Sequence, residues 1–348
     1  MAAQYVGKVV GGKSVRIGQN SPNGHILITG LSGSGKSVRI ADIENHIVET
    51  GETVIAFDIN GTHPDISDEI GNHISAQVDG LDDNLLDTTF VEQGRETSSN
   101  FVEYVVETIC PRELRGARQR ASVREAIKYA LEHRWEFSCD MEAIADGLLR
   151  QEDDAALGAY NHMCVLLEGG IFRKNATKII NGKINIVSLQ GITPKTQKQI
   201  MEVLLGVLWR QMRVKGCGEK TLTLVFDEFQ NLDFHSGSVL FQMLTESRKY
   251  NVSLILATQT LTGFSKKELA VIHQVATKLY FRQSLADVRK AAKEIDAWHI
   301  DKWRIQLSNL RIGQAIVVGE LEIGGRRLQQ PVITTSEYVQ NERGIRRG

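Results

Sequence analysis

One segment of eight residues, Gly30-Leu31-Ser32-Gly33-Ser34-Gly35-Lys36-Ser37, constrains the fold of this chain more than any other. It fits the pattern G-x-x-x-x-G-K-[S/T], in which glycines let the backbone curl until successive N–H groups point at one phosphate. In this pattern Lys36 would reach the β- and γ-phosphates of a nucleotide, and the Ser37 hydroxyl would bind Mg²⁺. The residues expected to contact the nucleotide are Gly30, Ser32, Gly33, Ser34, Gly35, Lys36, Ser37 and Val38.

The residues on both sides of this segment favour a phosphate loop. Residues 25–29 form an apolar strand that leads into it, and apolar residues recur at helical spacing over 38–48. Gly51 follows where a glycine commonly ends a helix. The alternative is a glycine-rich turn that happens to contain Lys-Ser, and the strand before and helix after it argue against that alternative.

Charge and cysteine content limit the class of protein. The 348 residues are 42% hydrophobic, enough for one large domain or two smaller ones, and the net charge is −1. Because a protein that coats nucleic acid is usually basic, any nucleic-acid contact must be local. The four cysteines are dispersed, and no apolar run reaches the roughly 18 residues of a membrane helix. We expect a cytoplasmic protein with reduced thiols and no direct membrane insertion.

Hydrophobic patterning predicts an α/β fold with a helical insertion. Near-continuous apolar strands are expected at 53–58, 183–189, 221–226, 252–257 and 277–281, alternating with helices, and this rhythm implies a mostly parallel sheet. Between about 85 and 172 the strands vanish, and apolar stripes at helical spacing replace them. The predicted division is a core segment 1–84 with the phosphate loop, an all-helical insertion 85–175, and a second core segment 176–348.

An acidic pair ends the strand at 221–226. Asp227 would hold Mg²⁺ directly or through water, and Glu228 would polarise the water that attacks the γ-phosphate. The alternative is a strand that ends in a solvated acidic turn. A phosphate loop in the same chain favours the catalytic interpretation.

A glutamine ends the strand at 252–257. Gln259 is expected where a side chain could sense the γ-phosphate or position the attacking water. If this strand lies between the phosphate-loop strand and the acidic strand, the order is that of ASCE-type ATPases, in which a glutamate is the base. The alternative for Gln259 is an ordinary polar residue at a strand end.

Four segments together resemble the HerA/FtsK superfamily of ring-forming DNA-pumping ATPases, which includes the motor ATPases of conjugation and type IV secretion. They are GLSGSGKS, DEFQNL, RKYNVSLILATQT and LSNLRIGQAIVVG. The resemblance covers most of the chain and implies a RecA-like (ASCE) P-loop core that uses ATP and Mg²⁺. The predicted helical block resembles the insertion of the secretion-type members.

The resemblance also implies a homo-hexamer with ATP bound between subunits and an arginine from the neighbouring subunit at the γ-phosphate. Arg248 matches the family position, Arg282 is the rival candidate and Arg311 a weaker one; a surface cation at a helix end is the alternative for Arg248. Thr62-His63 stands where many relatives carry a glutamate, so the role of the loop after Asp58 is open.

The resemblance implies DNA contact through loops that face a central pore. The loop 230–238 is one candidate, and a basic cluster of Arg173, Lys174 and Lys178 is another, although a solvated face is the better interpretation of that cluster. Neither a membrane helix, nor a long N-terminal barrel, nor a C-terminal winged helix is evident.

These expectations favour a hexameric ATP-driven DNA translocase. A nuclease, or a conjugation or secretion component, would supply its targeting. Two other classes stay open: an ATPase that moves or unfolds protein, and a nucleotide switch that gates a partner assembly. Kinase chemistry fits less well, because Glu228 and Gln259 suit water better than a phosphoryl acceptor.

Overall fold

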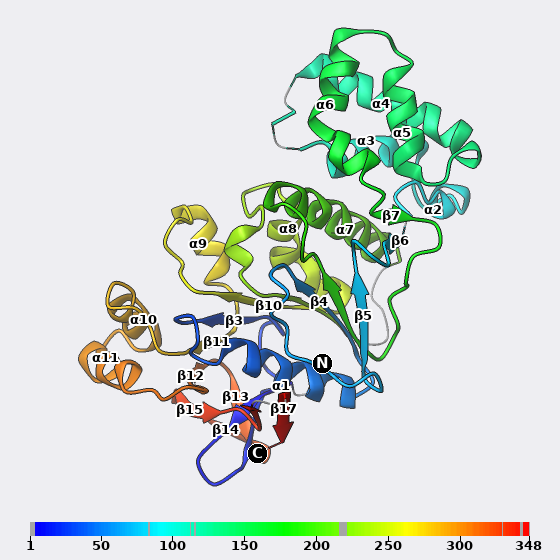
Figure 1. Ribbon diagram of the computed structural model, residues 1–348. Coiled ribbons are helices and arrows are strands. Elements are labelled where there is room, and N and C mark those ends of the chain that lie inside the picture. Colours follow the sequence, from blue (N-terminus) through cyan, green and yellow to red (C-terminus); the bar gives the residue numbers. More distant parts are fainter. Residues whose placement is uncertain are drawn as a thin grey trace. The chain divides into compact units, whose positions relative to one another are not determined.

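The computed structural model describes residues 4–82, 84–111, 113–114, 116–215, 221–328, 330–341 and 344–347. Contacts between Cα atoms divide the chain into two compact units. The first, here the core unit, contains residues 1–73, 179–188 and 217–348; the second, the helical unit, contains 74–178 and 189–216. Figure 1 shows the elements of both.

One large sheet runs through the core unit, with thirteen strands in the described part of the chain. In spatial order they are β14 (Arg326–Leu328), β13 (Leu321–Ile323), β2 (Ser14–Ile17), β1 (Tyr5–Lys8), β15 (Val332–Thr335), β12 (Gln314–Val318), β11 (Thr277–Tyr280), β3 (Ile26–Thr29), β10 (Val252–Thr258), β9 (Leu222–Phe226), β4 (Thr53–Asp58), β8 (Ile184–Ser188) and β5 (Gly71–Ser75).

The centre of the sheet is parallel, as the apolar runs predict. Strands β11, β3, β10, β9, β4 and β8 pair in parallel in that order. Strand β10 therefore lies between the phosphate-loop strand β3 and the acidic strand β9, which confirms the predicted strand order. All the carboxyl ends of these strands meet at one edge of the sheet, where ligands bind in open α/β folds.

Strands β1 and β2 form a hairpin that lies within the sheet and not at its edge. Strand β1 pairs with β15, and β2 pairs with β13, in an antiparallel extension that ends in the β13–β14 hairpin. Gly324 and Gly325 form the turn of that hairpin with φ of 55° and 76°. Two glycines at positive φ are typical of a two-residue hairpin, so the sequence carried a local signal for it.

Helices and short pairs complete the core unit. They are α1 (Lys36–Glu49), the 3-10 turns η2 (Phe229–Asn231) and η3 (Ser247–Tyr250), α8 (Val239–Glu246), α9 (Lys266–Ile272), α10 (Val288–Ile295), α11 (Ile300–Ser308), and the antiparallel pair β16 (Tyr338–Asn341) and β17 (Gly344–Arg347).

Apolar side chains of α1 build the main core. Ile40, Ile43 and Ile47 are buried in one cluster with residues of β3, β4, β8, β9 and β10, whereas α10 and α11 form a second cluster with β11 and β12. Spacing of three and four residues puts the α1 side chains on one face. This packing holds the helix that follows the phosphate loop against the parallel strands.

The helical unit contains α2 (Thr89–Glu92), α3 (Ser98–Ile109), α4 (Ala117–His133), η1 (Arg134–Glu136), α5 (Asp140–Leu149), α6 (Asp154–Glu168), α7 (Pro194–Lys215) and the short strands β6 (Leu81–Asp82) and β7 (Phe172–Arg173). The three predicted apolar stripes lie on α3, α4 and α5. Helix α7, expected from sequence in the second core segment, groups with this unit.

Buried contacts tie α7 to α3. The guanidinium of Arg210 lies 4.3 Å from the ring centre of Phe101 and donates two hydrogen bonds to Glu96. Gly206 approaches Thr108 so closely that a Cβ atom would lie 2.5 Å from its methyl group.

Within the described ranges, no helix is both long and apolar enough to cross a membrane.

Candidate nucleotide-binding site

The phosphate loop joins the carboxyl end of β3 to the start of α1. Its glycines adopt φ of 156° at Gly30, 71° at Gly33 and 100° at Gly35, all in the region that favours glycine. A Cβ atom on Gly30 would lie 2.5 Å from Cβ of Phe281, and one on Gly35 would lie 2.8 Å from the nitrogen of Gly313. The loop therefore requires glycine both for its curvature and for space, and it presents the positive end of α1 to an anion.

Lys36 is buried and bound to its own loop. Its ammonium donates to the carbonyl oxygens of Gly30 at 2.9 Å and Leu31 at 3.2 Å. Burial lowers the pKa of Lys36, against the pull of the carboxylates of Glu228 and Asp227. A phosphate would give this ammonium a charged partner in place of two neutral carbonyls.

The backbone turn after β9 points the two adjacent carboxylates in different directions. Glu228 has φ of 58° and ψ of 45°, a left-handed conformation that few residues other than glycine adopt. Asp227 Oδ2 accepts from Ser37 Oγ at 3.0 Å, whereas Glu228 Oε1 accepts from Gln259 Nε2 at 2.7 Å. Glu228 also accepts a bond from Gln230.

The structure thus brings together five of the predicted site residues from three strand ends: Lys36, Ser37, Asp227, Glu228 and Gln259. The rest of the predicted nucleotide contacts lie on the same loop and helix. Ser32 and Gly33 are exposed at the loop tip, Ser34 is buried and bonds to the Leu31 carbonyl at 2.7 Å, and Val38 is half-buried on α1.

Ser37 and Asp227 fit a magnesium ion. Both offer oxygen, the ligand type that Mg²⁺ prefers, and a cavity of about 10 Å³ that they line with Asp58 and His63 is close to the space of one water molecule. Burial, followed by the nearby Glu228 charge, raises the pKa of Asp227. A bound cation would favour the ionised form of this carboxyl and reverse that shift.

A buried arginine, which the sequence did not single out, supports the loop from behind. Gly313 donates its N–H to the carbonyl of Ser34 at 2.9 Å and accepts a bond from Arg39 at 3.0 Å. Arg39 is fully buried on α1 and also donates to the Val6 carbonyl and the Thr334 hydroxyl, each at 2.8 Å. An arginine four residues before Ile43, on the apolar face of the helix, is the signal that could have revealed it.

The loop after β4 is tied to α1 beside the site. Asp58 accepts the backbone N–H groups of Thr62 at 3.0 Å and His63 at 3.2 Å, and the His63 ring lies 2.9 Å from Glu44. Burial alone would lower the pKa of His63, but the Glu44 carboxylate outweighs it and raises the pKa to about 9. His63 therefore forms a buried ion pair at the position where the sequence left the role of this loop open.

Replacing His63 with glutamine is expected to destabilise the core unit in a pH-dependent way. Because the folded-state pKa of about 9 lies above the unfolded value of 6.5, the stabilisation is complete below pH 6.5 and disappears as pH rises through 9. The loss should be on the order of 3 kcal/mol at pH 6 and small at pH 10, measured by urea unfolding. His299→Gln, at an exposed histidine paired with Asp296, is the control and should cost little stability. An equal loss for His63→Gln at both pH values would contradict the prediction.

The three candidate arginines lie in two different places. Leu31 donates to the backbone carbonyl of Arg282, and Arg311 precedes the Gly313 contact, so both belong to segments beside their own phosphate loop. Arg248 lies in η3, just before β10 begins. Since β10 is parallel to β3, Arg248 lies at the sheet edge opposite the phosphate loop.

Arg248 lines an open cavity of about 180 Å³ at that opposite edge, here called the strand-start cavity. The cavity is also lined by residues near the starts of β4, β9 and β10: Glu52, Thr221 and Ser253. The Arg248 side chain is exposed and has no hydrogen-bond or ion-pair partner within the described ranges.

The two candidate DNA-contact segments belong to different units of the chain. The loop 230–238 is anchored by the buried Phe234 ring, which packs against Phe229 and Phe264, and its tip at Ser236 and Gly237 is exposed. In the basic cluster, Arg173 donates to the carbonyls of Gln77 and Val78, and Lys174 to that of Phe137. These two cations hold turns of the helical unit.

Comparison with known proteins identifies the family of this chain. The family model "Helicase HerA, central domain" matches residues 4–208, more than half of the chain. The DNA double-strand break repair helicase HerA of Sulfolobus acidocaldarius is 22% identical over 338 residues, covering 91% of this chain and 66% of the relative. The chain thus spans just under two thirds of that protein's length.

Solved structures show the same fold at low identity. VirB4 of Thermoanaerobacter pseudethanolicus has a TM-score of 0.69 at 16% identity and covers 98% of both chains. The bacterial conjugative coupling protein TrwBΔN70 has a TM-score of 0.67 at 13% identity and covers 97% of this chain and 89% of its own. The chain therefore belongs to the helicase HerA central-domain family, and it is a P-loop ATPase of the HerA/FtsK type.

Proposed function

We propose that this protein is a ring-forming, ATP-hydrolysing DNA translocase. One observation carries the proposal: Glu228 is held by Gln259 next to the Ser37–Asp227 pair, while Arg248, which has no side-chain partner among the described residues, lies at the opposite edge of the sheet. The first set can activate water and hold Mg·ATP. The second can serve only a nucleotide bound to another copy of the chain.

Each side chain of the site has a distinct task in hydrolysis. Lys36 binds the β- and γ-phosphates, and Mg²⁺ at Ser37 and Asp227 neutralises phosphate charge when bound. Glu228 accepts a proton from the attacking water, and Gln259, hydrogen-bonded to it, links that carboxylate to the γ-phosphate. The choice of ATP and Mg²⁺ is supported by structures of TrwB in complex with the analogue ADPNP, or with ADP and Mg²⁺.

The ring would couple subunits through Arg248. A head-to-tail ring of six copies would put the edge that carries Arg248 against the phosphate loop of the next copy. An arginine supplied from a neighbouring chain stabilises the charge that develops on the transferred phosphoryl group. In such a ring we assign the exposed tip at Ser236 and Gly237 to the pore, because this loop begins at Gln230, which contacts Glu228.

DNA as the cargo is supported by family membership and by the role of the HerA relative in DNA double-strand break repair. A nuclease, or a conjugation or secretion component, would select the substrate.

The described cysteines are free thiols, which supports a cytoplasmic location.

Mass measurement with an ATP analogue, with and without DNA, tests the proposal together with an ATPase assay. We expect a species six times the mass of the chain and a several-fold higher ATPase rate with DNA. Lys36→Ala removes the phosphate-binding ammonium. Any ATPase activity that this variant keeps would come from contaminating proteins. A rate indifferent to DNA would favour a protein-moving ATPase instead, and a monomer under every condition would favour a nucleotide switch.

A further inference from the structure

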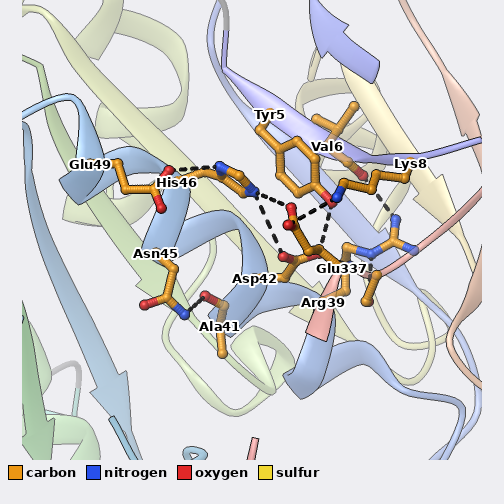
Figure 2. Close-up of polar contacts among 11 residues, drawn as sticks. Tyr5, Val6, Lys8, Arg39, Ala41, Asp42, Asn45, His46, Glu49 and Glu337 are labelled. Carbon is orange, nitrogen blue, oxygen red and sulfur yellow. Dashed lines mark hydrogen bonds and ion pairs between the residues drawn. The ribbon is translucent and has the colours of Figure 1, made fainter. Parts of the chain in front are cut away.

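A cluster of ionisable side chains surrounds the middle of α1, outside the nucleotide site. Asp42 and His46 are four residues apart, so both lie on one face of the helix, and Glu337 reaches them from the segment after β15. Figure 2 shows these side chains converging. One possible ligand atom from each of the three lies within 4.8 Å of the other two.

The separations match those of a tetrahedral metal site. His46 Nε2 lies 3.1 Å from Glu337 Oε2 and 4.0 Å from Asp42 Oδ1. Zinc binds imidazole nitrogen and carboxylate oxygen at about 2.0–2.2 Å, which puts two ligand atoms of a tetrahedron roughly 3.3–3.6 Å apart. To reach these values, the first separation would lengthen and the second would shorten by roughly 0.2–0.7 Å.

One of these ligand atoms is buried without a partner. The Asp42 side chain is 0% exposed, and within the described ranges its Oδ1 atom has no hydrogen-bond partner. A buried carboxylate oxygen costs free energy unless a donor or a cation satisfies it. His46 Nε2 lies 4.0 Å from this oxygen, and a cation between the two atoms would serve both.

The ring nitrogen of His46 that does not face the cluster, Nδ1, makes the kind of contact that is found in metal-binding histidines. His46 Nδ1 lies 3.1 Å from the carboxylate of Glu49. Such a carboxylate holds the proton on Nδ1 and turns the lone pair of Nε2 toward the metal. The lone pair of Nε2 would otherwise face the oxygens of Asp42 and Glu337.

The outer oxygens of the two carboxylates are also held. Asp42 Oδ2 accepts from the Tyr5 hydroxyl at 3.0 Å and from the backbone N–H of Glu337 at 2.9 Å, and Glu337 Oε1 pairs with Lys8 at 2.9 Å. Each candidate ligand therefore offers one atom to the centre and uses another in a fixed contact (Figure 2). Outer contacts of this kind orient ligands in metal sites.

Solvent can reach the cluster. The strand-start cavity of about 180 Å³ is lined by His46 and Tyr5 as well as by Arg248. The side chains of His46 and Glu337 are 11% and 13% exposed. An ion and a water molecule as fourth ligand can therefore enter without unfolding of the helix.

We propose that Asp42, His46 and Glu337 form a binding site for a divalent cation, with Zn²⁺ as the best match to one imidazole and two carboxylates. The ion would fasten the C-terminal segment at Glu337 to α1, the helix that carries Lys36 and Ser37. Arg39, three residues before Asp42, connects the same helix to Gly313 behind the phosphate loop. The site would thus stabilise the support of the nucleotide loop.

Titration of the chelator-treated protein with Zn²⁺ alone, in excess Mg²⁺, tests the proposal, and Co²⁺ absorption in the visible range reports the geometry. The wild type should bind one equivalent and gain thermal stability. His46→Gln and Glu337→Gln should bind at least 10-fold more weakly and lose the Zn²⁺-dependent gain in Tm. Glu49→Gln, which keeps all three ligands, should weaken binding about 10-fold.

Two controls identify the site. His299→Gln, at an exposed histidine paired with Asp296, should bind Zn²⁺ like the wild type, and so should Asp227→Asn, which removes the carboxylate expected to bind Mg²⁺. If His46→Gln does not fold, the wild type and Glu49→Gln still decide the outcome. The proposal is wrong if the wild type shows no saturable Zn²⁺ binding, or if Asp227→Asn abolishes binding while the His46 and Glu337 variants keep it.

Discussion

The Glu228→Gln variant is expected to hydrolyse ATP about 10³-fold more slowly than the wild type while it binds ATP with the same affinity. Glutamine has the shape of glutamate, and its amide oxygen can still accept the hydrogen bond that Gln259 donates at 2.7 Å. It cannot accept a proton from the attacking water. Steady-state turnover and equilibrium binding of a fluorescent ATP analogue measure the two quantities separately.

Glu320→Gln provides a matched control. Glu320 pairs with Arg327 on an exposed part of the antiparallel extension, so the same chemical change there should leave both turnover and binding unaltered. Turnover of Glu228→Gln within about threefold of the wild type would remove Glu228 from its role as the base. Loss of ATP binding in that variant would instead assign Glu228 to holding the nucleotide.

The central part of the fold could be predicted because its strands are local apolar runs that end in polar residues. Residues 53–58, 222–226 and 252–258 are β4, β9 and β10, and their polar ends meet at one edge because neighbouring strands are parallel. Such runs suit strands that are covered on both faces. Pairing between distant strands, such as β1 with β15, left no comparable local signal.

Local signals were present for some of the elements that were not predicted. Helix α9 begins with a capping box in which Ser265 and Glu268 bond to each other's backbone N–H, an S-x-x-E pattern visible in the sequence. The Gly324-Gly325 turn of β13–β14 is another example. Strand β5 gave no such signal, because its residues (GNHIS) alternate too little to indicate a strand.

The candidate site also has features with a local sequence signal and features without one. Motif spacing predicted that Lys36, Ser37, Asp227 and Gln259 would share one strand edge. It did not predict the backbone conformation that points the carboxylates of Asp227 and Glu228 in different directions, because the left-handed backbone at Glu228 depends on the surrounding turn. Arg39 was missed because its partners come from β1, β15 and the 313 loop, which only the folded chain brings together.

Removal of Arg248 is expected to reduce turnover by about 10³-fold or more without destabilising the chain, because an arginine supplied in trans contributes 10³–10⁵ in kcat. Arg248 is exposed and has no side-chain partner in the described part of the chain, so Arg248→Ala leaves no buried group unpaired. Steady-state ATPase assays in the presence of DNA measure the loss, and circular dichroism monitors the fold. Arg282→Ala separates the two positions, since Arg282 lies beside its own phosphate loop.

Mixing two inactive variants tests whether Arg248 acts on a neighbouring subunit. Lys36→Ala keeps the arginine but has no competent phosphate loop, whereas Arg248→Ala keeps the loop. In a random 1:1 mixture, about one interface in four would combine an intact Lys36 with an intact Arg248 from the next subunit. Activity should therefore reappear on mixing, because a complete site would form between two defective chains. If the mixture stays as inactive as its components although mixed rings form, or if Arg248→Ala alone retains most of its turnover, the arginine must come from elsewhere, and Arg282 acting beside its own loop would be the next candidate.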